Sequence, residues 1–194
     1  MVIWPHIANF LRNKRPAITI PGIGSSPRDI ETFYNSYALP EDERRFARHL
    51  IASKAISENM PDMIIPYDPD EGAESLIEKI ERSADDLMRR TGSPPIITVS
   101  MDSLEFNYGH EGSLKIVSSI AAWTRRNEGL SLLSDKSTYP ELTRRIATIS
   151  SIHLRLTRRH GCLLLYGVKP RTNLYALKVE TEKGYYETRL IPIT

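Results

Sequence analysis

The sequence predicts an α/β fold in which a mostly parallel sheet is followed by antiparallel hairpins. Residues 96–101 are apolar on both faces apart from Thr98 and Ser100, as expected of a central parallel strand that helices cover on both sides. After Ser151 apolar and polar residues alternate, which is typical of antiparallel strands. We therefore expect one α/β domain over residues 1–194, with a mixed sheet.

Short strands and helices alternate through the first half of the chain. Residues 16–21 are predicted to form a strand that ends in the glycine-rich turn 22–26. A helix is expected to start at Pro40, with its apolar side formed by Phe46, Ala47, Leu50 and Ile51. Residues 63–67 are a further strand candidate. The clearest helix begins at Glu71 and ends at Gly92.

The second half continues the alternation and then changes period. The pattern predicts a helix over 112–127, a strand over 129–133 and a short helix after Pro140. Two hairpins follow. The first covers 152–168 and turns at 159–161, and the second covers 174–191 and turns at 182–184.

Length and composition indicate an ordinary globular protein. The 194 residues are 40% hydrophobic and 26% charged, and no apolar run approaches the roughly 18 residues that span a bilayer. The first residues lack the pattern of a secretory signal, so we expect a cytoplasmic protein with no membrane partner. The single cysteine, Cys162, lies in a leucine-rich run and is expected to pack in the core.

Charge is distributed unevenly along the chain. The first hundred residues carry 12 basic and 15 acidic side chains, whereas residues 115–171 carry 11 basic and 3 acidic ones. Such an asymmetry suits nucleic-acid contact, for example with DNA through the basic half, or head-to-tail self-association. A solvated cationic surface without a partner is the third interpretation.

No phosphate-binding loop is present in the sequence. Glycines nowhere lead into Gly-Lys-Ser or Gly-Lys-Thr, the arrangement whose backbone amides and lysine hold nucleotide phosphates. The turn 22–26 follows a strand, but it contains no lysine, and Pro27 has no backbone N–H group. We expect the chain to lack ATPase activity of its own and to need no cofactor.

The second half resembles the RecA/KaiC-like ATPase superfamily, in the branch with archaeal RadA paralogues and gas-vesicle-regulator-like proteins. The matching pieces are the strand ending Val-Ser-Met-Asp-Ser at 99–103, the strand 130–133 and the stretch Lys-Pro-Arg-Thr-Asn at 169–173 with the hairpin after it. The resemblance implies a RecA-like three-layer sandwich whose phosphate-loop unit has been deleted.

This resemblance assigns roles to two groups of residues. Asp102 and Glu105 would stand on the metal side of a nucleotide site that has degenerated. Lys169, Arg171 and Thr172 would lie at a subunit boundary, where the two cations reach a neighbour's γ-phosphate. The family usually has a glycine where this chain has Thr172.

Three arginine pairs are candidates for binding the phosphate backbone of nucleic acid: Arg125 and Arg126, Arg144 and Arg145, and Arg158 and Arg159. No aromatic residue is interleaved with them in the sequence, which argues against a stacking platform for single strands. The histidines are scattered without ligand spacing, so no metal site is expected.

These observations lead to one main expectation and two alternatives. The main expectation is a degenerate RecA-like protein that acts as an accessory or regulatory subunit, by association with itself or with a RecA-like ATPase, in archaeal DNA recombination and repair. The first alternative is an ATPase that binds nucleotide at a non-standard site. The second is a nucleic-acid-binding module that uses the basic half.

Overall fold

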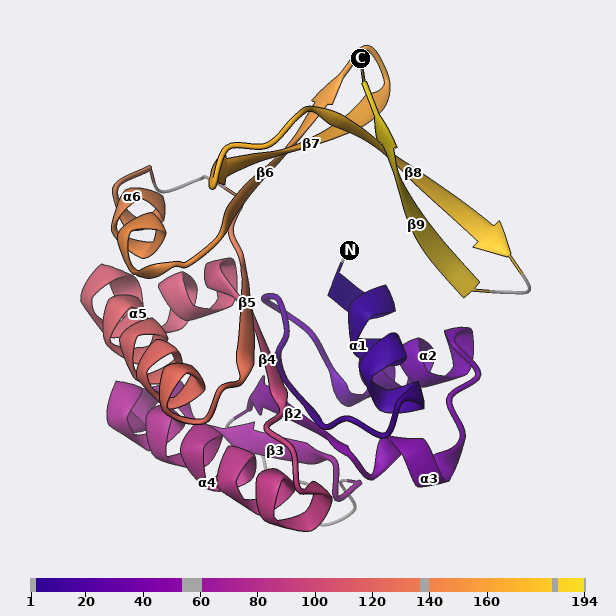
Figure 1. The fold of residues 1–194 in the computed structure, drawn as a ribbon. Helices are drawn as coiled ribbons and strands as arrows, with labels where there is room; N and C mark the ends of the chain where they lie inside the picture. Colours follow the sequence, from indigo (N-terminus) through magenta and orange to yellow (C-terminus); the bar gives the residue numbers. More distant parts are fainter. Residues whose placement is uncertain (1–2, 54–60, 137–139, 183–184, 194) are drawn as a thin grey trace. The chain divides into compact units, whose positions relative to one another are not determined.

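The computed structural model describes residues 3–53, 61–136, 140–182 and 185–193. The chain divides into two compact units, residues 1–143 and 144–194 (Figure 1). The single domain expected over residues 1–194 stays a prediction, because compact units also occur within one cooperatively folding domain.

The first unit is built on a five-stranded parallel sheet. Its strands lie in the order β3 (Ile64–Tyr67), β2 (Ala47–Ala52), β1 (Ala17–Ile20), β4 (Ile96–Ser100) and β5 (Leu130–Ser134). β1 is buried along its whole length, and β4 is buried up to Ser100. This burial on both faces explains why their sequences are apolar apart from Thr19, Thr98 and Ser100.

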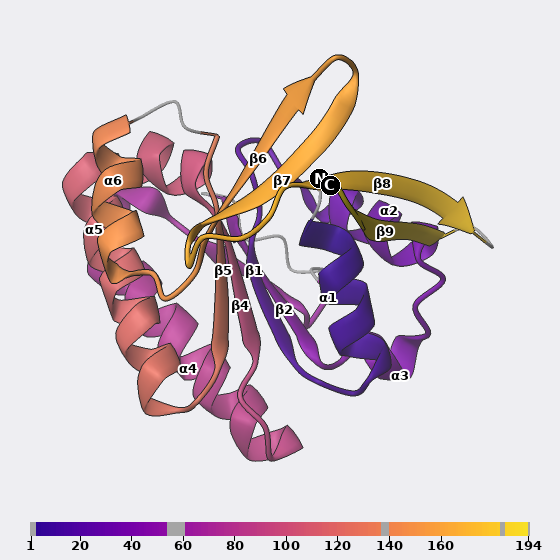
Figure 2. The same ribbon diagram turned by 45° about the horizontal axis from the view of Figure 1, so that its top comes forward.

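Helices cover both faces of this sheet. α1 (Ile3–Arg12) and α2 (Pro27–Ser36) lie on one face, and α4 (Ala73–Thr91) and α5 (Met101–Arg126) lie on the other (Figures 1 and 2). α3 (Glu41–Arg44) and the 3₁₀ turn Pro69–Glu71 are short connections. Gly92 caps the carboxyl end of α4, and its φ of 71° is the left-handed conformation that glycine adopts without strain.

α5 begins directly after β4 and is broken at Gly109. The backbone there has φ 61° and ψ −171°, a conformation that only glycine adopts readily, so two helical pieces meet at this residue. The sequence pattern predicted the second piece from residue 112 but missed the first. No helix in the described residues is long and apolar enough to cross a membrane.

The strand order creates a switch point in the sheet. From β1 the chain continues to β2 on one side, whereas from β4 it continues to β5 on the other side. The carboxyl ends of β1 and β4 are neighbours, and the loops that leave them diverge. In open α/β sheets, ligands bind in the crevice outside the strand ends at such a point.

The second unit contains a four-stranded antiparallel sheet. β6 (His153–Arg159), β7 (Cys162–Lys169), β8 (Tyr175–Glu182) and β9 (Tyr185–Pro192) pair in sequence order. α6 (Pro140–Ile149) crosses the boundary between the units. Both predicted hairpins are confirmed, although residues 183–184 of the second turn lie outside the described part of the chain.

The α/β class and the parallel central sheet are confirmed, but the mixed sheet is wrong. The antiparallel strands form a sheet of their own, and among the described strands β5 pairs with β4 alone. The pattern of apolar residues indicates which faces of a strand are buried, but it does not indicate which strand pairs with it.

Two local expectations are also corrected. The helix expected after Pro40 stops at Arg44, and the apolar positions from Ala47 onward belong to the strand β2. A short apolar run fits a buried strand and a helix equally well. Cys162 is exposed instead of buried, because it lies next to the turn of the β6–β7 hairpin.

Candidate functional site

The candidate site lies at the switch point of the parallel sheet. It comprises the loop 22–26 after β1, Ser100 at the end of β4, Asp102 at the start of α5, and Lys136 after β5. We call it the switch-point site. A β-carbon added at Gly22 would lie 3.7 Å from the Ser100 hydroxyl oxygen, so the first two segments are in close proximity. The parallel pairing of β4 with β5 brings residue 136 to the same end of the sheet.

Asp102 is the best-connected side chain of this site. The Ser100 hydroxyl and the Ser103 backbone N–H both donate to its Oδ1, the latter at 3.1 Å. The Lys136 ammonium forms an ion pair with Oδ2. Both carboxylate oxygens therefore have partners from the chain itself.

These partners determine the charge of Asp102. Partial burial alone would raise the pKa of its carboxyl, but the hydrogen bonds from Lys136 and Ser100 outweigh burial and hold the pKa below its usual value. Asp102 is thus an anion whose charge is balanced by a lysine.

The loop after β1 ends in a helix start that is already capped. The backbone N–H and the hydroxyl of Ser26 donate to Asp29 Oδ2 at 2.8 and 2.7 Å, an arrangement in which a carboxylate occupies the first turn of α2. These two hydrogen bonds lower the pKa of Asp29. A phosphate at this helix start would meet that negative charge, and Pro27 offers it no N–H group.

Glu105 lies one turn after Asp102 but has different surroundings. It is buried, and its Oε1 contacts His110 Nδ1 on the other side of the Gly109 break. Its second oxygen has no hydrogen-bond partner within the described residues. Asp102 and Glu105 are therefore engaged separately, and among the described residues no three acidic, histidine or cysteine side chains are grouped to hold a metal ion.

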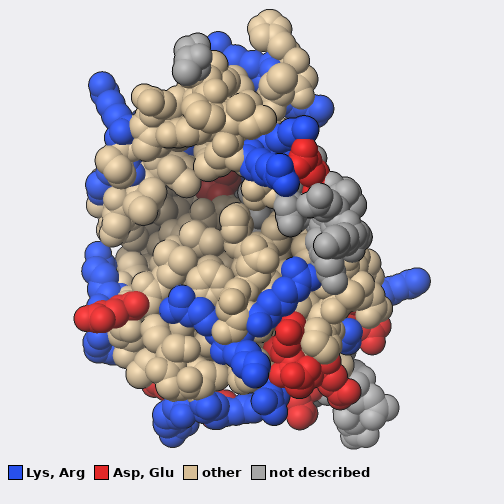
Figure 3. Space-filling model, turned by 45° about the vertical axis from the view of Figure 1, so that its right-hand side comes forward, with Lys and Arg blue, Asp and Glu red and all other residues tan. Residues whose placement is uncertain are grey.

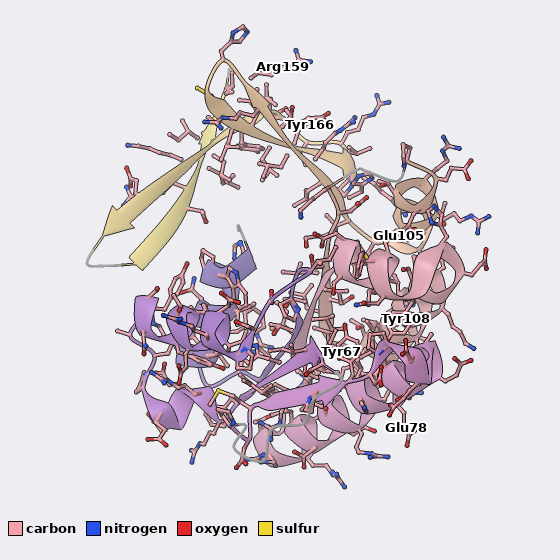
Figure 4. The ribbon with its side chains drawn as sticks, turned by 180° about the vertical axis from the view of Figure 1, so that it is seen from behind. Tyr67, Glu78, Glu105, Tyr108, Arg159 and Tyr166 are labelled. Atoms are coloured by element: carbon pink, nitrogen blue, oxygen red, sulfur yellow. The ribbon has the colours of Figure 1, made fainter. Side chains whose placement is uncertain are left out.

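Two tyrosines, Tyr67 and Tyr108, lie near each other in the first unit (Figure 4). Tyr67, the last residue of β3, stacks on Tyr108 of α5 with ring centres 6.4 Å apart. The Tyr108 hydroxyl is buried and, in the described part of the chain, has no hydrogen-bond partner. Burial raises the pKa of both phenols, which stay neutral.

The residues expected at a subunit boundary lie at the end of β7 and in the turn that follows it. Lys169 Nζ donates to the Ser150 carbonyl oxygen at 2.6 Å. Thr172 Oγ1 accepts from the Gly167 N–H at 2.8 Å and closes the turn, so threonine has a structural role where the resemblance implies glycine. Arg171 is exposed, and no acidic partner is found for it among the described residues.

The arginine pairs belong to three different elements. Arg125 and Arg126 end α5, and Arg144 and Arg145 lie in α6. Successive residues of a strand point to opposite faces, so Arg158 and Arg159 do not act as a pair on β6. Arg155, which the sequence does not single out, lies on the same face of β6 as Arg159.

Comparisons with known proteins support the fold alone. No family model matches the sequence, and no curated protein matches it. One similar solved structure is an uncharacterised protein, PH0321 from Pyrococcus horikoshii, which was crystallised in complex with an unknown peptide. It aligns over 97% of this chain and 85% of its own length, with a TM-score of 0.62 and 9% sequence identity.

Proposed function

We propose that this chain is a RecA-like protein that has lost nucleotide hydrolysis and acts as an accessory or regulatory subunit, in archaeal DNA recombination and repair. The observation that carries the proposal is the pairing of Asp102 with Lys136 and Ser100. In an active relative this carboxylate would face a hydrated metal ion. In this protein Lys136 of the same chain supplies the positive charge.

The loop after β1 supports the same conclusion. Its helix start is occupied by Asp29, the N–H groups of Ser25 and Ser26 are hydrogen-bonded within the chain, and residues 22–26 contain no lysine. A subunit without a nucleotide of its own can still contribute to a partner's site, and exposed Arg171 is the residue suited to that role. The peptide bound to the Pyrococcus protein is in keeping with a polypeptide partner.

Nucleotide binding and turnover of the purified chain test the proposal. We expect no saturable binding of a fluorescent ATP analogue with Mg²⁺ and no phosphate release, for the wild type and for Asp102→Ala alike. Turnover by the wild type that disappears in Asp102→Ala would refute the proposal. It would establish the alternative, an ATPase with a non-standard site.

A mixed assembly tests the accessory role. The chain is combined with a RecA-like ATPase from the same cell, and ATP hydrolysis by that partner is measured. We expect Arg171→Ala to lower the partner's hydrolysis, whereas Arg15→Ala, which also removes one exposed arginine, leaves it unchanged. Equal hydrolysis with wild type and Arg171→Ala would contradict a role for Arg171 in the partner's site.

A further inference from the structure

One face of the β6–β7 hairpin combines cations with an aromatic ring. Arg155, Thr157 and Arg159 alternate along β6 and share this face. The register pairs Arg155 with Tyr166 and Thr157 with Leu164 on β7. With Leu174 these residues line a surface depression of about 320 Å³, and we call them together the hairpin face.

The charge of the second unit favours an anionic partner. Residues 144–194 contain ten lysine and arginine residues and three glutamates, a net charge of +7, whereas the whole chain carries only +2. In Figure 3 the side chains of this unit, in the upper part of the view, are mostly tan and blue, with little red. The second unit is therefore the basic part of an otherwise acidic chain.

The cations of the hairpin face are not neutralised by the chain. Lys178 on β8 and Arg189 on β9 pair with Glu180, at 2.6 and 3.2 Å. Within the described residues, neither Arg155 nor Arg159 has an acidic partner. Both side chains are exposed and remain available for a ligand.

We propose that the hairpin face binds single-stranded nucleic acid. Arg155 and Arg159, with Thr157 between them, form a row of polar groups about 6.6 Å apart along the strand, which suits a sugar-phosphate backbone. Tyr166, opposite Arg155 in the register, supplies a ring on which a base stacks (Figure 4).

The ring and leucines distinguish single strands from other anions. In a duplex the bases are stacked inside the helix, so its phosphates would contact the arginines but no base would reach Tyr166. An acidic peptide would also contact the arginines, but its carboxylate side chains offer no aromatic ring for Tyr166 to stack on. The proposal does not depend on the switch-point site, because every residue of the hairpin face belongs to the second unit.

The test is a titration of the full chain with labelled oligonucleotides, followed by fluorescence anisotropy. The probes are an oligothymidylate, an oligouridylate and a duplex of equal length, at low salt. We expect both single strands to bind more tightly than the duplex. The two single-strand probes show whether DNA or RNA is preferred.

Two arginines that are neighbours in the sequence provide a matched pair of variants. Arg159→Ala and Arg158→Ala remove the same charge from opposite faces of β6. We expect Arg159→Ala and Arg155→Ala each to reduce the slope of log affinity against log salt by about 0.7, and Arg158→Ala to leave it nearly unchanged. Tyr166→Leu is expected to weaken binding about five-fold or more, whereas Tyr166→Phe retains binding.

The proposal is overturned by any of the following results. These are no binding at low salt, equal affinity for duplex and single strand, and equal losses with Arg158→Ala and Arg159→Ala. Polyglutamate or anionic vesicles that displace the oligonucleotide as well as an unlabelled single strand of equal charge would also overturn it. Such a result would mean that the surface binds any polyanion and that Tyr166 does not contribute. Circular dichroism verifies the fold of each variant, and if Tyr166→Leu is unfolded, Tyr166→Phe and the arginine variants still test the proposal.

Discussion

Thr19 and His49 lie opposite each other on β1 and β2, and their side chains are hydrogen-bonded inside the first unit. The second ring nitrogen of His49 is hydrogen-bonded to the Tyr34 hydroxyl of α2 at 2.6 Å. His49 has no exposed surface, so burial, with a smaller effect from Arg48, lowers its pKa to about 3. A neutral histidine thus joins two strands and a helix.

The free energy of unfolding should fall in acid because of His49. The unfolded chain takes up a proton on this residue near its ordinary pKa of about 6.5, whereas the folded protein does so only near 3. The contribution of neutral His49 to the free energy of unfolding is therefore fully present above pH 6.5, and it decreases as the pH falls toward 3. The slope is at most about 1.4 kcal/mol per pH unit. Urea unfolding at a series of pH values measures it.

Two glutamine variants isolate this effect from other titrating groups. His49→Gln keeps hydrogen-bonding atoms near Thr19 and Tyr34 but cannot take up a proton. Its free energy of unfolding should therefore fall less in acid than that of the wild type. His6→Gln changes an exposed histidine and serves as the control. Identical pH profiles for wild type and His49→Gln would exclude His49 as the cause.

Removal of either hydroxyl partner should destabilise the first unit. Tyr34→Phe and Thr19→Val each leave one nitrogen of buried His49 without a partner, at a cost of about 1–3 kcal/mol. The triple variant Thr19→Val, Tyr34→Phe, His49→Leu should lose less free energy of unfolding than the sum of the losses of the three single variants. The reason is that it leaves no polar atom of the group unpaired. Strict additivity in urea unfolding would argue against a coupled group.

The charge state of Asp102 should depend on Lys136. In Lys136→Ala the carboxyl keeps its partial burial and loses its strongest partner, so its pKa should rise. Carboxyl chemical shifts measured by NMR against pH report this directly. Lys115→Ala, which removes the partner of Glu74, is the control and should leave Asp102 unchanged. The effect on stability is expected to stay below about 1 kcal/mol, because Lys136 is 75% exposed.

The elements that the sequence predicts well are those with a local signal. The strand β4 is apolar apart from Thr98 and Ser100, and α4 combines a regular apolar stripe with Gly92 after its last residue. The hairpins follow from alternation and from the glycine at 161. β2 was predicted as a helix because its run of apolar residues is too short to show a period.

The candidate site could be predicted only in part. Asp102 stands out as an acid at the end of a buried strand. Its partner Lys136 is 34 residues away and reaches it only because β4 pairs with β5. Similarly, Arg158 and Arg159 are adjacent in the sequence and lie on opposite faces of a strand, while Arg155 and Tyr166 meet through the register of a hairpin.

The turn that holds Lys169 and Arg171 should depend on the absence of a side chain at Gly167. A β-carbon at this position would lie 2.4 Å from the Pro170 carbonyl oxygen and 2.7 Å from Thr172 Cγ2, so the turn between β7 and β8 must open to admit it. We expect Gly167→Ala to cost about 1–3 kcal/mol and to speed amide hydrogen exchange in β7 and β8. Gly22→Ala is the control, because its β-carbon would meet nothing closer than 3.7 Å. Unchanged amide hydrogen exchange in Gly167→Ala would show that the turn admits the new side chain without loss of stability in β7 and β8.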